Sequence, residues 1–112
     1  MNREIKFRGY SEELKSFVYG FYHEVDVEGI GYSYIFWQGN TTYVSADSVA
    51  QFTGMYDKNG KEIYEGDILF HHLQGKRKVY YPFSKDSAIY GIENLENGMK
   101  SYLVDSHLYE LQ

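Results

Sequence analysis

Residues 51–69 (QFTGMYDKNGKEIYEGDIL) hold the densest group of chemically reactive side chains in this sequence. Glu62, Glu65 and Asp67 place three carboxylates within six residues, a spacing suited to general acid–base catalysis or to a divalent cation. In an extended chain, Glu65 and Asp67 share a face and Glu62 points away from it. Calcium takes about six to eight oxygen ligands, and the sequence has no D-x-D-x-D-G loop. We therefore predict no catalytic residue and no metal site in this segment.

His71 and His72 are the next residues with metal-binding chemistry. Neighbours on a strand point to opposite faces, so we do not expect this pair to chelate one ion. His23 and His107 are distant in sequence, and a lone His is more often a surface or satisfied core group than a ligand. The chain has no Cys, which excludes disulfides, zinc–thiolate sites and Cys nucleophiles.

Motifs of the common enzyme classes are absent from the sequence. It has no G-x-S-x-G elbow, no H-E-x-x-H pair and no P-loop. Gly29-Ile30-Gly31 does not continue to the third Gly of a dinucleotide fingerprint. We predict that the protein is not an enzyme, with no catalytic residue, no metal and no cofactor.

A basic and aromatic segment, QGKRKVYY, is the strongest candidate for contact with nucleic acid or a partner. Its candidate contact residues are Lys76, Arg77, Lys78, Tyr80 and Tyr81. Single-stranded nucleic acid is bound by cations that neutralise phosphate and by rings that stack on bases. The alternative is a solvated basic loop with one Tyr packed inside. The net charge of −5 disfavours nucleic acid, although a local basic patch can outweigh it.

The glycines of residues 51–69 favour a structural interpretation of that segment. Asp57 to Gly60 predict a hairpin turn, either type I with a Gly60 bulge or type I′ centred on Asn59 and Gly60. Gly66 and Asp67 predict a turn that feeds a strand, with the Asp carboxylate accepting turn N–H groups. The predicted structural turn residues are Asp57, Asn59, Gly60, Gly66 and Asp67.

The composition indicates which elements position these residues. With 13 Tyr, 7 Phe, 1 Trp and 11 Gly but a single Pro, the chain favours strands joined by tight turns. Eight or nine short segments with strand character recur at roughly 8–12-residue spacing, as in small barrels and sandwiches. The ambiguous segment 45–50 allows one short helical turn. We predict a single all-β domain over residues 1–112.

The aromatic content also predicts contacts with other proteins. Tyr is enriched at interfaces because one ring offers area and a hydroxyl group at low entropic cost. The rings that we expect to take part are Tyr32, Tyr34, Trp37, Tyr80 and Tyr81. The alternative is cross-strand pairing of these rings on a solvated face. No run approaches the roughly 20 apolar residues that span a bilayer, so we expect no membrane partner.

Three segments resemble the YopX family of small phage and prophage proteins. They are REIKFRG at residues 3–9, VYG at 18–20 and the whole of 51–69. The family signature Q-Y-T-G-L-x-D-K-N-G-K-E-I-Y-E-G-D-I is matched except that Phe52 and Met55 replace its Tyr and Leu. The segment around residues 10–15 and the C-terminal third depart from the family pattern.

The resemblance implies an all-β fold with SH3-like barrel character, self-association into a homo-oligomer, and a phage or prophage origin. It implies no enzymatic activity, because the family has no established biochemical function. We therefore expect a cytoplasmic protein of the host cell that binds copies of itself, or a host or phage protein. The alternative is a β-barrel that binds nucleic acid through residues 76–81.

Overall fold

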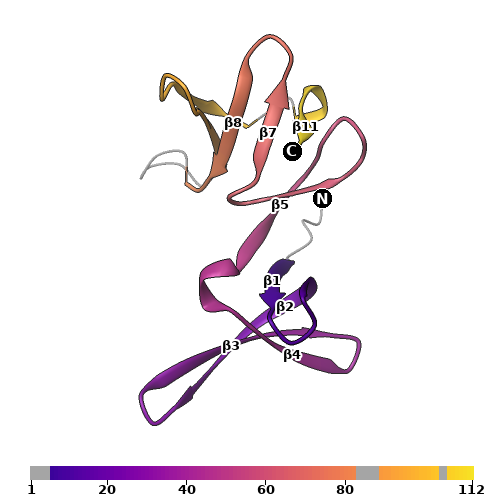
Figure 1. Ribbon diagram of the computed structural model, residues 1–112, viewed down its shortest axis with the longest axis vertical. Coiled ribbons are helices and arrows are strands. Elements are labelled where there is room, and N and C mark those ends of the chain that lie inside the picture. The colour runs from indigo at the N-terminus through magenta and orange to yellow at the C-terminus, as the bar shows by residue number, and fades with distance from the viewer. Residues whose placement is uncertain (1–5, 83–88, 104–105) are drawn as a thin grey trace. The chain divides into compact units, whose positions relative to one another are not determined.

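The computed structural model describes residues 6–82, 89–103 and 106–112. Eleven strands and two short 3-10 turns make up the secondary structure of these residues (Figure 1). The strands are β1 (Phe7–Ser11), β2 (Ser16–Val27), β3 (Ile30–Trp37), β4 (Asn40–Val44), β5 (Ala50–Tyr56), β6 (Glu62–Tyr64), β7 (Ile68–His71), β8 (Gly75–Tyr80), β9 (Gly91–Asn94), β10 (Lys100–Tyr102) and β11 (Glu110–Leu111). The 3-10 turns are η1 (Ala46–Ser48) and η2 (Ser106–Leu108). The all-β prediction is confirmed; η1 is the helical turn expected in 45–50, and η2 was not expected.

The strands form two antiparallel sheets, with the orders β4-β3-β2-β1-β5-β6 and β10-β9-β8-β7-β11. The predicted SH3-like barrel does not close. A closed barrel needs every strand to be hydrogen-bonded on both sides. Here the edge strands β6 and β11 have only three and two residues. Each therefore offers few backbone N–H and C=O groups for pairing with another edge strand. The open edges therefore leave two sheets in place of one cylinder.

The chain divides into two compact units, Met1–Phe52 (unit 1) and Thr53–Gln112 (unit 2). In unit 1, β2 pairs through residues 16–20 with β1 and through residues 21–27 with β3. β3 alternates as a half-buried strand does, since Ser33 and Ile35 are buried on one face and Phe36 is exposed on the other. β4 pairs with β3 and completes a three-stranded meander. The turn from β2 enters β3 at one end, and the turn to β4 follows its other end (Figure 1).

Two glycines of the family-like segments permit close approach of the unit 1 strands. A Cβ atom at Gly9 would lie 2.7 Å from Cγ2 of Val44, closer than real side chains come. A Cβ atom at Gly20 would collide with the carbonyl oxygen of Phe36. A side chain at either position would therefore push the strands apart, which explains glycine in REIKFRG and in VYG.

The turns of unit 1 use positive φ at both central residues. Glu28 and Gly29 join β2 to β3 with φ of 53° and 84°, and Gln38 and Gly39 join β3 to β4 with φ of 49° and 84°. Positive φ at both positions is the type I′ geometry, whose twist matches that of the flanking strands. Gln38 and Gly39 therefore form a two-residue hairpin loop.

Unit 2 contains a continuous apolar core built from β6, β7, β8 and β9 and from single residues just before β9, just after β10 and just before β11. The core residues are Ile63, Leu69, Val79, Tyr90, Ile92, Leu103 and Tyr109. The register pairs Val79 with Ile92 across β8 and β9, so period-two alternation places both in the core. The same sheet therefore has a second, outward face.

Candidate functional site

The Asp57 carboxylate organises the first turn of residues 51–69. Its Oδ1 accepts the backbone N–H groups of Asn59 and Lys61 at 2.8 and 2.9 Å, and its Oδ2 accepts that of Leu111 at 3.0 Å. Burial by itself would raise the pKa of Asp57, but these N–H groups and the charge of Lys61 outweigh it and lower the pKa. Only Gly60, at 80°, has positive φ among residues 57–60, so the turn is type I with a Gly bulge.

Gly66 and Asp67 form the second turn of residues 51–69. Gly66 has φ of 89°, and Asp67 Oδ2 accepts the N–H of Tyr64 at 2.7 Å. The N–H of Gly66 and the carbonyl oxygen of Asp67 bond to the backbone of Val79 on β8. The carboxylate and the glycine therefore fix how the chain enters β7.

The three carboxylates of this segment are not gathered into a site. Glu65 and Asp67 flank the turn glycine, and Glu62 Oε1 accepts the Tyr64 hydroxyl at 2.8 Å. Across residues 6–82, 89–103 and 106–112, no three His, Asp or Glu side chains lie close enough together to hold a metal ion.

His71 and His72 do not point to opposite faces, as we had expected from a strand. Their rings stack with centroids 4.8 Å apart, because β7 ends at His71 and His72 begins the turn. His71 Nδ1 accepts the N–H groups of Leu73 and Gln74 at 3.1 and 3.3 Å. This nitrogen is therefore engaged in the turn that leads to β8.

The residues predicted for partner contact fall on two different faces of the unit 2 sheet. Lys76, Lys78 and Tyr80 alternate with Arg77 and Val79 along β8, and Val79 is fully buried. The two lysines and Tyr80 therefore point outward, whereas Arg77 lies on the side of the core. They belong to a strand and not to the turn that we predicted, since β8 begins at Gly75.

The outward side of this sheet carries basic and aromatic residues from several strands. Register places Lys78 and Lys100 on either side of Glu93, and Tyr80 and Tyr102 on either side of Gly91. We call this the basic face of unit 2. Its side chains are Ile68, Phe70, Lys76, Lys78, Tyr80, Glu93, Lys100, Tyr102 and Glu110.

Tyr80 is the centre of the basic face. Its ring covers Gly91, where a Cβ atom would lie 2.6 Å from Cζ of the ring, and Lys100 Nζ lies 5.5 Å from the ring centroid. Burial raises the pKa of the Tyr80 hydroxyl, and the charge of Glu93 raises it further. Tyr81 follows the strand and packs on Tyr90 with centroids 4.8 Å apart. Sequence reasoning missed Lys100 and Tyr102, because strand register alone brings them to Tyr80.

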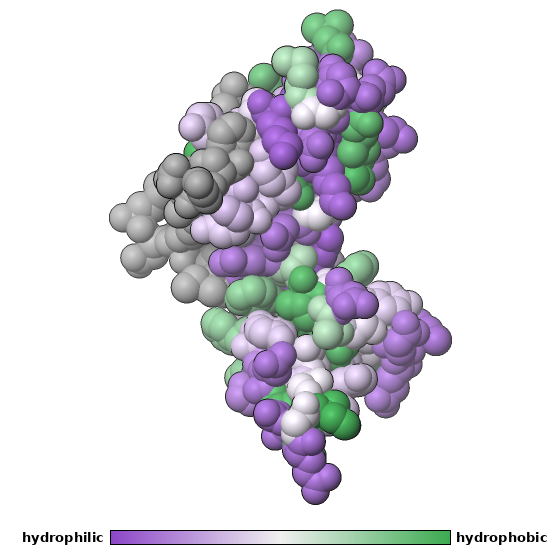
Figure 2. Space-filling view, turned by 90° about the vertical axis from the view of Figure 1, so that its left-hand side faces the viewer, coloured by the Kyte–Doolittle hydropathy of each residue, from purple (hydrophilic) through white to green (hydrophobic). Residues whose placement is uncertain are grey.

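Unit 1 presents a face of a different kind, which we call the outer face of unit 1. It is the side of β2, β3 and β4 opposite the buried residues Ser33, Ile35 and Val44. Its side chains are Phe21, His23, Val25, Val27, Ile30, Tyr32, Tyr34, Phe36, Thr41 and Tyr43. None of the ten is Asp, Glu, Lys or Arg. In the space-filling view of Figure 2, green apolar residues of unit 1 lie among white and purple ones.

The aromatic residues on the outer face of unit 1 remain accessible. Phe21, Phe36 and Tyr43 are 52%, 44% and 55% exposed. Tyr34 meets Tyr43 edge-to-face at 5.7 Å, so part of the predicted cross-strand pairing is present. Of the aromatic residues predicted for contacts, Tyr32 and Tyr34 lie here, and Trp37, at the end of β3, has its ring centroid 6.1 Å from that of Phe21. The lack of charge at alternate positions of residues 21–36 was the sequence signal that we missed.

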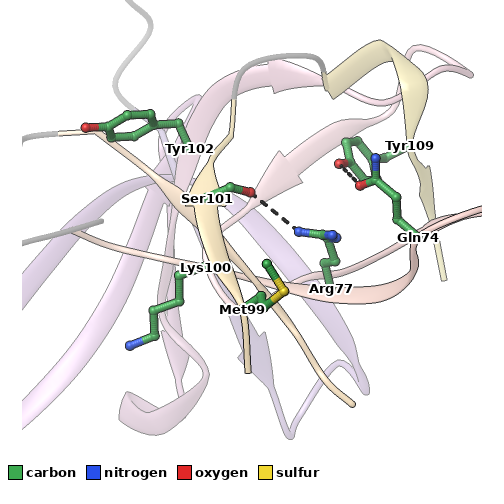
Figure 3. Close-up of a pocket in the computed structure, with 7 residues that line it drawn as sticks. All are labelled: Gln74, Arg77, Met99, Lys100, Ser101, Tyr102 and Tyr109. Carbon is green, nitrogen blue, oxygen red and sulfur yellow. Dashed lines mark hydrogen bonds between the residues drawn. The ribbon is translucent and has the colours of Figure 1, made fainter. Parts of the chain in front are cut away.

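Unit 2 also contains a hollow of about 430 Å³ on the side of the sheet that carries Arg77 (Figure 3). Arg77 and Ser101 lie near its centre, with Met99 on one side and Gln74 with Tyr109 on the other. Lys100 and Tyr102 also line it, with their side-chain ends directed away from Arg77 (Figure 3). We call this the Arg77 hollow.

These features define an all-β protein with two open antiparallel sheets. The chain belongs to the YopX protein family, whose model matches residues 6–107 and so extends across both units. The match confirms the resemblance found in the sequence. Among individually curated proteins, none shows significant similarity to the chain. No helix in the described part of the chain is long and apolar enough to cross a membrane.

Proposed function

We propose that this protein is a non-enzymatic, phage- or prophage-derived binding protein that assembles with copies of itself in the host cytoplasm. The resemblance of residues 3–9 and 51–69 to phage proteins supports the biological setting. The observation that carries the assembly is the outer face of unit 1, where ten neighbouring side chains include no charged residue.

An antiparallel sheet with one face in the core normally presents a polar face to water. Glu24 and Asp26 of β2 are on the side of this sheet that also carries the buried Ser33 and Ile35, so the charges and the exposed aromatic rings are on opposite sides. An exposed, contiguous apolar face of this kind indicates a surface that another molecule covers.

A second copy of the same face is the partner that fits best. A surface without charged side chains has no ion-pair partners for a charged protein. Two identical uncharged faces match each other in polarity and can pack around a twofold symmetry axis. An aromatic side chain can bury about 150–250 Å², and three rings remain about half exposed. With Val25, Val27 and Ile30, the face offers several hundred Å², on the order of the roughly 800 Å² that each subunit buries in a standard interface.

The experiment is light scattering coupled to size-exclusion chromatography on the full chain and two variants. Val25→Lys combined with Phe36→Lys places two like charges on the outer face of unit 1, and we expect it to yield monomers. Leu14→Lys is the matched control, because Leu14 is 57% exposed in the turn before β2 and lies off this face. We expect the control to assemble like the unaltered protein.

A monomeric unaltered protein at micromolar concentration would refute the proposal. So would an oligomer that persists in the double variant, since the interface would then lie elsewhere. Far-ultraviolet circular dichroism on each variant separates loss of assembly from loss of folding.

A second candidate function, nucleic-acid binding, is supported by the basic face of unit 2. Lys76 and Lys78 share the face of β8 that carries Tyr80, and Lys100 Nζ lies 5.5 Å from its ring, which combines cations for phosphate with a ring for base stacking. Glu93 and Glu110 on the same face oppose it, as does the net charge of −5. We therefore place it second.

Fluorescence anisotropy with a labelled single-stranded oligonucleotide at low salt tests this candidate. If it holds, Lys76→Gln with Lys78→Gln weakens binding, and binding falls as salt rises. Lys15→Gln with Lys61→Gln makes the same charge change away from this sheet and is the control. Absence of binding below high micromolar concentration removes nucleic acid as a partner.

A further inference from the structure

We propose that the Arg77 hollow binds a small molecule through an oxyanion, a carboxylate or a phosphate, attached to a compact apolar group. This site is distinct from the outer face of unit 1 and from the basic face of unit 2. Its volume of about 430 Å³ falls within the roughly 300–1,000 Å³ of small-molecule sites.

The Arg77 guanidinium is poorly satisfied by the protein itself. A guanidinium has five N–H donors, and the hydrogen bond that Arg77 makes within the described residues runs from Nη1 to Ser101 Oγ at 3.4 Å. Its Nε–H is buried without an acceptor among those residues. An unsatisfied buried donor costs about 1–3 kcal/mol, more when the group is charged. A bound oxyanion would supply the acceptors that are lacking.

The position of Arg77 is fixed by the sheet. β8 is the central strand, and Arg77 pairs with Leu69 on β7 and with Asn94 on β9. Leu69 and the neighbouring Val79 are fully buried, so the backbone that carries Arg77 is held on both sides. An Arg on an exposed loop differs, because its backbone is not held by neighbouring strands. The cation is therefore held in place before a ligand arrives, which lowers the cost of binding.

The charge of the Arg77 hollow also selects an anion. Arg77 is the cation inside it, since the Lys100 side-chain end points away and lies over the Tyr80 ring, and the lining includes no Asp or Glu in the described part of the chain. The chain as a whole is acidic, with 16 Asp and Glu against 11 Lys and Arg. A cavity whose lining has the opposite sign to the whole molecule concentrates anions locally against the long-range field.

The other polar groups can share the oxyanion with Arg77. Ser101 Oγ accepts from Arg77 and keeps its own hydroxyl proton to donate (Figure 3). The Tyr109 hydroxyl donates to Gln74 Oε1 at 2.9 Å, which orients the Gln74 amide NH₂ as a further donor. A planar carboxylate can take two parallel bonds from a guanidinium, and a phosphate can do the same with one oxygen left over for Ser101.

The apolar part of the ligand is set by Met99 and Tyr109. Met99 is 65% exposed, and the Tyr109 ring packs against His71 with centroids 5.5 Å apart. A flexible thioether on one side of Arg77 and an aromatic ring on the other accommodate a small ring or a short branched chain. We therefore expect the ligand to combine one oxyanion with one such group.

The experiment is titration of the ¹⁵N-labelled full chain, followed by amide chemical shifts. The probes are benzoate, phenyl phosphate, inorganic phosphate and, as the uncharged control, benzyl alcohol. We expect saturable shifts at Gln74, Arg77, Ser101 and Tyr109 with benzoate or phenyl phosphate, weaker shifts with inorganic phosphate and none with benzyl alcohol. The preferred probe distinguishes a carboxylate from a phosphate ligand.

Arg77→Met removes the charge and keeps the length of the side chain. We expect it to weaken binding of the preferred probe about ten- to a hundredfold, the range of one hydrogen-bonded charge. Lys78→Met makes the same change on the opposite face of β8 and is expected to bind as the unaltered protein does.

The proposal is overturned if no anionic probe gives saturable shifts at the hollow, or if Arg77→Met and Lys78→Met weaken binding equally. Equal shifts with benzyl alcohol would also overturn it, because binding would then be apolar only. If Arg77→Met does not fold, Ser101→Ala, in which only the hydroxyl is lost, takes its place with an expected loss of several-fold.

Discussion

Single glycines determine how closely the strands of unit 1 approach. Gly20 lies against the carbonyl oxygen of Phe36, whereas Gly31, in the neighbouring strand, has room for a Cβ atom 3.4 Å from the Glu24 side chain. Gly20 also has φ of 156°, which residues with a side chain rarely adopt, so close approach and backbone conformation both require glycine there and neither does at Gly31.

Gly20→Ala is expected to lower the free energy of unfolding by more than about 3 kcal/mol, because the collision is with backbone that cannot move aside. Gly31→Ala is expected to change it by less than about 0.5 kcal/mol. Urea denaturation followed by tryptophan fluorescence measures both, since Trp37 adjoins Gly20. Equal effects of the two substitutions would contradict this explanation of the VYG segment.

The Asp57 carboxylate accepts three backbone N–H groups, including that of Leu111 from a distant part of the chain. Asp57→Ala leaves these donors without their acceptor, and we expect a loss of about 2–4 kcal/mol in unfolding free energy. Asp26→Ala is the control, because Asp26 accepts one N–H in an exposed turn. Asp26→Ala should cost under about 1 kcal/mol.

Asp57 also makes stability depend on pH. Its pKa in the folded protein lies below the ordinary value of 3.8. A depressed folded-state pKa stabilises the protein above the unfolded-state pKa and ceases to do so as pH falls through the folded-state pKa. We expect unfolding free energy to decrease on acidification below about pH 4, with a smaller decrease in Asp57→Asn. Urea midpoints at a series of acidic pH values measure this; parallel profiles would show that other carboxyl groups dominate.

Strands and turns show which parts of the fold the sequence predicts. Period-two alternation in residues 30–37 predicts the two faces of β3, and Gly29, Gly39 and Gly60 mark the turns, because few residues other than Gly adopt positive φ. Barrel closure was not predictable from strand patterns, because it depends on whether the edge strands form backbone hydrogen bonds with each other. The stacking of His71 on His72 was missed because it depends on where β7 ends.

The hairpin turns of unit 1 contain residues poorly suited to their conformation. Glu28 and Gln38 both have positive φ, which Asn tolerates better than either. Glu28→Asn and Gln38→Asn should each raise unfolding free energy by roughly 0.5 kcal/mol. Gln51→Asn makes the same chemical change in the extended strand β5 and should give no gain. Thermal melting measures the three variants, and destabilisation by Gln38→Asn would show that the type I′ geometry is wrong.

For the protein as a whole, the two units differ in how they are stabilised. Unit 2 has a continuous core with Ile63, Leu69 and Val79 fully buried, whereas much of β2 in unit 1 is exposed. The Arg77 hollow was not predictable from sequence, because β8, Met99 and Tyr109 belong to three separate segments that only the tertiary fold brings together.

This difference predicts uneven hydrogen exchange. Amides of β8 and β9 should exchange at least about tenfold more slowly than those of β2 and β3 at low protein concentration. If copies associate through unit 1, raising the concentration should slow exchange in β2 and β3 and leave β8 and β9 unchanged. Mass spectrometry of peptic peptides measures both, and concentration-independent exchange in β2 and β3 would argue against self-association.

The alternation of β8 has a consequence for how this protein can evolve. Lys76 and Lys78 face solvent and Arg77 faces the hollow, so three adjacent codons contribute to two separate surfaces. Selection on one surface can change every second codon and leave the other surface as it was. A mutational scan that replaces the three residues as one block would merge two phenotypes, whereas changing alternate residues would separate them.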